Sequence, residues 1–67
     1  MRPRWQWRMS DESGAGLDRP ASPVFEARYD AEEWLGEHWR SLASQGVRGA
    51  QLLQEGEPVG PSVAIPV

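Results

Sequence analysis

A chain of 67 residues has room for one small domain, and a domain of about 60 residues buries only about 60% of the surface that its unfolded chain exposes. The sequence has no cysteine and one histidine, which excludes disulfide bridges, thiolate zinc sites and metal sites made of several histidines. The formal net charge is −3, and the composition predicts a single domain over residues 1–67 that binds no cofactor and no metal.

The first predicted element is a strand over residues 4–10, which read RWQWRMS. Trp5, Trp7 and Met9 share one face of this strand, and the two arginines and the glutamine between them share the other. Because a strand of alternating character is half-buried, we expect the tryptophan face to belong to the core and the arginine face to meet solvent.

A polar turn and a second, shorter strand are predicted next. Residues 11–16 read DESGAG, which is typical of a turn. After an irregular connection, residues 24–28 read as a strand. Pro23 cannot donate a ladder hydrogen bond, so we expect this strand at an edge of the sheet.

Residues 29–46, read YDAEEWLGEHWRSLASQG, predict one helix with a signal at each end. Asp30 is placed to cap the first turn, and Glu33 is placed to bond back to the cap in a capping box. The tyrosine that begins the segment and Trp34 have the spacing of a hydrophobic staple. Gly46 is suited to the left-handed residue that closes a helix.

One face of the predicted helix is apolar. At about 100° per residue, a single arc collects Ala31, Trp34, Leu35, His38 and Leu42. Trp39 lies on the flank of that arc, and Gly36 interrupts the helix at a cost of about 1 kcal/mol relative to alanine. Gly36 either allows another segment to approach closely or has no special role.

Two more strands complete the predicted fold. Residues 47–54 read as a third strand and residues 59–67 as a fourth, joined by a tight turn at Glu55-Gly56. Pro61 and Pro66 argue for an edge position of the last strand. The sequence therefore predicts an α+β domain with the order β-β-α-β-β, in which one helix packs on one face of a small antiparallel sheet of three to four strands.

The surplus of tryptophan suggests a surface that contacts a partner. Trp39 is the best candidate for partial exposure, and aromatic side chains beside arginine are typical of hot spots at protein interfaces. Trp39 and Arg40 would form such a patch with Trp5 and Arg8 if the first strand lies beside the helix. The alternative is that Trp39 only covers the rim of a small core.

Single-stranded nucleic acid is the competing partner. Arg2, Arg4 and Arg8 lie in a segment without acidic residues, where phosphates could pair with arginine and bases could stack on indole rings. Two observations make nucleic acid the less favoured partner. The tryptophans are expected to face the core, and the chain is acidic overall.

An enzymatic role is not expected. His38 has Ser41 within one helical turn but lacks the combination of base, nucleophile and orienting group that catalysis needs. A chain of this size is also expected to be too small to enclose a typical ligand pocket of about 300–1,000 Å³. The acidic residues around the helix start lack the spacing of a calcium loop.

The pattern WQWR, then DAEEWLGEHWR, then GV, LL and a late GP resembles a group of small uncharacterised proteins of high-GC Gram-positive bacteria. The resemblance implies a small freestanding protein and no particular activity. The first residues lack the apolar run of a signal peptide, and the longest apolar run is far shorter than the roughly 20 residues of a membrane span. We therefore expect a cytoplasmic, non-enzymatic protein-interaction module that binds another protein or itself, with no membrane or small-molecule partner.

Overall fold

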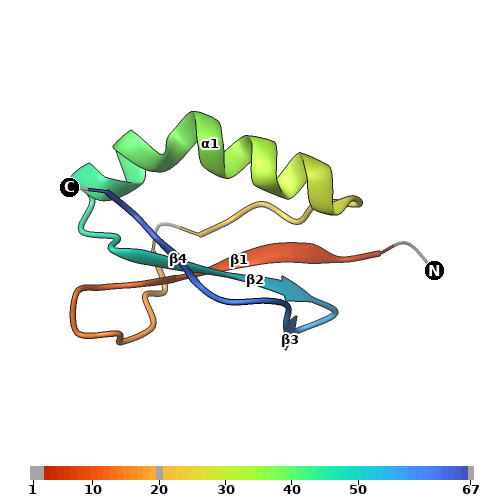
Figure 1. The fold of residues 1–67 in the computed structure, drawn as a ribbon, viewed down its shortest axis with the longest axis horizontal. Coiled ribbons are helices and arrows are strands. Elements are labelled where there is room, and N and C mark those ends of the chain that lie inside the picture. The colour runs from red at the N-terminus through yellow and green to blue at the C-terminus, as the bar shows by residue number, and fades with distance from the viewer. Residues whose placement is uncertain (1–2, 20, 67) are drawn as a thin grey trace.

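An antiparallel sheet is built around one central strand, and a helix lies across one face of that sheet (Figure 1). The computed structural model describes residues 3–19 and 21–66. Its elements are β1 (Trp5–Ser10), α1 (Arg28–Ser44), β2 (Gly49–Gln54), β3 (Glu57–Pro58) and β4 (Val63–Ala64). β1 pairs with one edge of β2, and the short strands β3 and β4 pair with the other. The predicted α+β class, with a helix on one face of a small antiparallel sheet, is confirmed.

The alternation in β1 places its side chains as expected. Trp7 pairs with Leu52 and Met9 pairs with Ala50 across the β1–β2 ladder, and all four side chains are buried. Arg8, between them, is exposed on the opposite face of the sheet. Successive residues of a strand point to opposite faces, so the helix covers the tryptophan face and leaves the arginine face uncovered by α1.

The predicted second strand over residues 24–28 is reduced to one bridge. Trp5 and Phe25 exchange backbone hydrogen bonds of 2.8 and 2.7 Å, and the helix then begins at Arg28. Ser22 is buried, and its hydroxyl accepts a hydrogen bond from the backbone N–H of Trp7 at 3.0 Å. The segment therefore covers the outer edge of β1 without forming a ladder, and the described elements follow the order β-α-β-β-β.

The helix starts two residues before the predicted cap. Its N-cap is Ala27, where no side-chain capping hydrogen bond is found among the described residues, and Asp30 lies inside the first turn. Tyr29 is 72% exposed, so the predicted staple is wrong. The bridge between Trp5 and Phe25 holds the backbone in an extended pairing up to Phe25, so the helix begins only after it, at Arg28. Asp30 still lies near the positive end of the helix dipole, where negative charge is favourable.

The helix ends as the sequence predicts. Gly46 has φ of +93° and donates its backbone N–H to the carbonyl of Ala43 at 3.1 Å. Val47 donates to the carbonyl of Leu42 at 3.1 Å, which completes a Schellman motif. Arg48 adds a side-chain hydrogen bond of 2.8 Å from Nη1 to the carbonyl of Ala43. Three donors thus satisfy carbonyls of the last turn.

The core lies between α1 and the sheet. Its buried side chains come from β1 (Trp7, Met9), α1 (Ala31, Leu35, Leu42), β2 (Ala50, Leu52) and the flanking Val47 and Ile65. A side cluster packs against it on one flank of the helix, where the ring of Trp34 lies 5.9 Å from Phe25 and stacks on His38 at 4.9 Å. Burial of these side chains is the main stabilising contribution to a small domain.

The predicted fourth strand is broken in the middle. Residues 59–62 leave the ladder between β3 and β4, and the side-chain amide of Gln51 donates to the carbonyls of Val59 at 3.3 Å and Gly60 at 3.1 Å. Gly60 has φ of +69°, which a strand does not adopt, and Pro61 has no N–H to donate. The turn before β3 is as predicted, because Glu55 and Gly56 both have positive φ.

The turn after β1 is organised by one carboxylate. Asp11 accepts hydrogen bonds from the backbone N–H of Ser13 at 2.9 Å, the hydroxyl of Ser13 at 2.7 Å and the backbone N–H of Ala15 at 3.1 Å. These bonds, that of the Ser13 hydroxyl first, lower the pKa of Asp11 below its ordinary value.

The lowered pKa predicts how the turn responds to acid. A carboxyl whose pKa is lower in the folded state stabilises the fold above its unfolded pKa, and this contribution is lost as the pH falls through the folded pKa. In an NMR titration, the carboxyl of Asp11 and the amide of Ser13 should therefore titrate together, below the ordinary range of an aspartate. A midpoint at or above that range would contradict the hydrogen-bonded turn.

Candidate functional site

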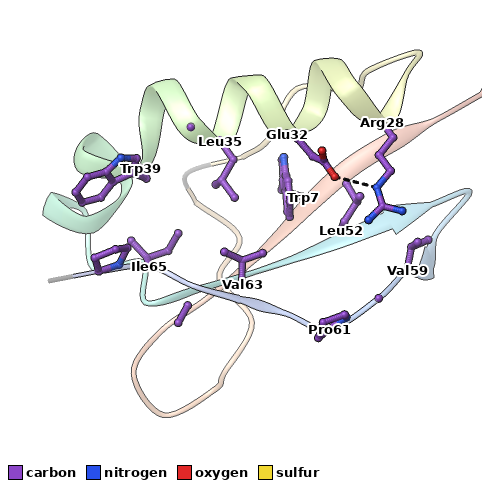
Figure 2. A pocket seen from close by; sticks show the side chains of 14 residues that line it. Trp7, Arg28, Glu32, Leu35, Trp39, Leu52, Val59, Pro61, Val63 and Ile65 are labelled. Carbon is purple, nitrogen blue, oxygen red and sulfur yellow. Dashed lines mark hydrogen bonds and ion pairs between the residues drawn. The ribbon is translucent and has the colours of Figure 1, made fainter.

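A groove of about 550 Å³ runs between α1 and the C-terminal segment, residues 59–66. Figure 2 shows Trp7 and Leu52 between its two walls, Leu35 and Trp39 on the helix wall, and Val63 and Ile65 on the opposite wall. The lining is mainly apolar. The size falls within the range of about 300–1,000 Å³ typical of ligand sites. This space is an open groove between the helix and the C-terminal segment and not an enclosed pocket, and the sequence does not predict it.

The floor of the groove is held by a buried hydrogen bond. Trp7 is 5% exposed, and its indole Nε1–H donates to the carbonyl of Ala31 in α1 at 2.7 Å. The bond ties the first strand to the helix and satisfies the one polar group of the indole ring. Leu52 pairs with Trp7 from β2, so the floor is made by the two longest strands.

At Gly36, near the centre of the helix wall, no side chain extends into the groove. No side chain or neighbouring segment in the described residues comes within 4 Å of the point where a Cβ of Gly36 would lie, although Gly36 lines the groove. The close approach that the sequence allows at this glycine is therefore not made by the described part of the chain. Gly36 is exposed and leaves the groove open beside Leu35 and Trp39.

Gly36→Ala is expected to stabilise the protein by about 0.5–1 kcal/mol, because alanine favours the helix and meets no neighbour. Urea unfolding followed by far-UV circular dichroism measures this change. Gly46→Ala is the matched control and should destabilise the protein, since φ at this glycine is +93°. A loss of stability in Gly36→Ala would mean that the helix is closely covered at this position.

Charged groups lie on the helix side of the groove. Arg28 Nε donates to Glu32 Oε1 at 2.9 Å, and both side chains are about half exposed (53% and 52%). Figure 2 shows this pair beside Trp7 and Leu52 and away from Trp39. The opposite wall, residues 59–66, reads VGPSVAIP and has no charged residue. The guanidinium of Arg40 lies 5.2 Å from the ring centroid of Trp39, in cation–π geometry.

The structure separates the four residues of the predicted contact patch. Trp39 and Arg40 lie together, and Trp39 lines the groove. Trp5 lies at the opposite end of the sheet, where it is bridged to Phe25. Arg8 lies on the opposite face of the sheet from Trp5, because the two residues are three positions apart in one strand. The four side chains therefore do not form one surface.

The arginines proposed for nucleic-acid binding lie apart from the indoles. Arg4 and Arg8 are exposed, and Arg8 lies on the sheet face away from the tryptophans. The guanidinium of Arg8 already packs over the backbone of Gly16, 3.3 Å from the point where a Cβ would lie. Arg2 lies outside the described residues. Stacking of bases and pairing of phosphates would therefore take place on different faces.

The imidazole of His38 contacts Trp34, one helical turn before it. Its Nδ1 lies 2.9 Å from the carbonyl of Trp34, on whose ring the imidazole stacks. Ser41, the predicted neighbour, instead accepts a hydrogen bond of 3.3 Å from Gln45 at its hydroxyl. Among residues 3–19 and 21–66 no three potential metal ligands gather, and no helix is long and apolar enough to cross a membrane.

The C-terminal wall is the part of the site that sequence analysis missed. The alternation of Val59, Val63 and Ile65 predicts a continuous strand and gives no indication that residues 59–62 leave the sheet edge. The useful signal was Gly60-Pro61, because a glycine followed by a proline interrupts a ladder. The break allows residues 59–62 to leave the sheet edge and form the far wall.

Comparison with models of protein families finds no match, and searches of curated proteins and of solved structures find no significant similarity either.

Proposed function

We propose that the protein is a non-enzymatic interaction module that docks another protein chain in the groove between α1 and residues 59–66. The apolar groove itself carries this proposal. Its lining is mainly apolar, Trp39 and Val59 are half-buried at its walls, and Val63 on its far wall is 42% exposed. Trp39, with Arg40 over its ring, lies at one end and has the residue types that dominate binding energy at interfaces.

Edge-to-edge strand addition is the less favoured mode of docking. The outer edge of β1 is covered by residues 22–25 through Ser22 and Phe25. The other edge of the sheet is formed by β3 and β4, which have two residues each and are separated by Gly60-Pro61. Short, interrupted edge strands with proline are how sheets avoid pairing with other chains. The groove is the apolar surface that remains for docking.

The alternative of single-stranded nucleic acid has weaker support. It would use Arg4 and Arg8, which share a sheet face that carries no aromatic side chain among the described residues of the sheet. Base stacking supplies much of the affinity of such proteins, and the arginines alone would give a weak, salt-sensitive contact.

The two functions are distinguished by affinity capture from a native lysate with the tagged protein, with and without nuclease. The baits are wild type, Trp39→Ala and Arg4→Ala. For the groove, we expect one protein in near-stoichiometric amount that resists nuclease, is retained by Arg4→Ala and is lost by Trp39→Ala. Material that disappears with nuclease or high salt, and with Arg4→Ala but not Trp39→Ala, would contradict the proposal and support nucleic acid.

A further inference from the structure

One stripe of α1 at the mouth of the groove is nearly symmetric in charge about Gly36. At about 100° per residue, Glu32 and Arg40 lie four positions to either side of Gly36 and within about 40° of it around the helix axis. Tyr29 and Ala43 lie seven positions to either side and within about 20°. We call these five residues the Gly36 stripe. Glu32, Gly36 and Arg40 are all exposed.

We propose that the occupant of this surface is a second copy of the same chain, whose α1 crosses the first antiparallel at Gly36. The proposal specifies the partner of the docking function above and rests on it. In such a two-fold arrangement each residue meets the one at the mirrored position of the other copy. Glu32 of each copy then lies opposite Arg40 of the other, so one contact produces two equivalent ion pairs, each beside the Arg28–Glu32 pair within the chain.

Three properties of the stripe favour this occupant. Gly36 has no side chain at the crossing point and no neighbour in the described residues within 4 Å of its missing Cβ, so a second helix can approach closely. Residues four positions from the crossing are only about 6 Å along the axis from it, within reach of arginine and glutamate at a shallow crossing angle. Tyr29, which is 72% exposed, would lie against Ala43 of the second copy, whose side chain is half-buried on the core of its own chain.

The charge of the stripe also identifies where two acidic chains can meet. Each copy carries a net charge of −3, and the acids Asp30, Glu33 and Glu37 lie about 60–120° from Gly36 around α1, so a contact centred on that flank of the helix places like charges together. In the Gly36 stripe the acid Glu32 lies on one side of the crossing and the base Arg40 on the other, so the five residues carry no net charge. It borders the groove, since Glu32 and Gly36 belong to both. A second α1 lying on the stripe would therefore cover the mouth of the groove.

Charge exchange tests this geometry by sedimentation equilibrium. Glu32→Arg makes the stripe doubly positive and Arg40→Glu makes it doubly negative, so each variant alone should dimerise at least about tenfold more weakly than wild type, because like charges meet. An equimolar mixture of the two should form a heterodimer, and the double variant should regain the homodimer. Glu37→Arg, the same charge change away from the stripe, should dimerise like wild type.

A wild-type chain that stays monomeric up to about 1 mM, or a dimer that the single variants leave unchanged, would overturn the proposal. So would a mixture of Glu32→Arg and Arg40→Glu that remains monomeric when the double variant dimerises. Failure of the second-copy proposal is distinguishable from failure of the docking function. A monomer that still captures a different protein through Trp39 would remove the second copy as partner and leave the groove as a docking site.

Discussion

Trp7→Ala is expected to remove most of the stability of the protein at room temperature. The indole is 5% exposed, belongs to the core and donates its N–H to Ala31 at 2.7 Å. Removing a buried tryptophan costs about 3–5 kcal/mol. Small domains are at the lower end of the usual 5–15 kcal/mol of stability, so the loss is comparable with the total. Urea unfolding monitored by circular dichroism measures it.

Trp7→Phe separates the hydrogen bond from the packing. Phenylalanine keeps an aromatic ring in the core but has no donor for the carbonyl of Ala31, so we expect a smaller loss of about 1–3 kcal/mol. Trp39→Ala, at a half-buried position, should cost less than Trp7→Ala. An unfolding free energy of Trp7→Ala within about 1 kcal/mol of wild type would contradict the position assigned to this indole.

Ser22→Ala is expected to destabilise the protein by about 1–3 kcal/mol, although it removes only one hydroxyl. Ser22 is 8% exposed, and its hydroxyl accepts a hydrogen bond from the backbone N–H of Trp7 at 3.0 Å and donates one to the carbonyl of Pro23 at 2.8 Å. Without it, the N–H of Trp7 loses its partner on the covered edge of β1. Thermal unfolding measures the stability, and hydrogen exchange should show faster exchange at the amide of Trp7.

Ser62→Ala is the control for this substitution. Ser62 is exposed between β3 and β4, and the same change there should alter stability by less than about 0.5 kcal/mol. Equal stability losses in Ser22→Ala and Ser62→Ala would contradict the view that the Ser22 hydroxyl satisfies the backbone N–H of Trp7 at the outer edge of β1.

Local signals in the sequence predicted the parts of the fold that depend on local chemistry. Gly46 closes the helix because only a residue that tolerates positive φ completes the Schellman motif. The alternation of Trp5, Trp7 and Met9 set the faces of β1 because the side-chain period of a strand is two. Glu55-Gly56 forms the predicted turn for the same local reason.

Contacts between residues far apart in the sequence determine where the helix begins and where the last strand breaks. The helix begins at Arg28 and not after Asp30, because the bridge between Trp5 and Phe25 holds the chain before it. The last strand is split because the amide of Gln51 binds the carbonyls of residues that leave the ladder. Neither interaction has a periodic signal in the sequence.

The candidate site was predicted only in part. Trp39 was expected at a contact surface from its position on the flank of the helix, and the structure places it in the groove. The grouping with Trp5 and Arg8 failed because it required the first strand to lie beside Trp39 on one surface. The groove depends on the distance between α1 and residues 59–66, which is set by the packing of Ile65 and the break at Gly60-Pro61. Sequence pattern contains no measure of that distance.

The most direct test of the docking groove compares three proteins that differ only at Gly36. Gly36→Ala leaves the groove open, whereas Gly36→Trp places a large side chain over it, and both should fold because no neighbour in the described residues contacts the missing Cβ. We predict that wild type and Gly36→Ala capture the same protein and that Gly36→Trp loses it with a melting temperature no lower than that of wild type. Equal capture by all three proteins would contradict the claim that the groove is where a partner binds.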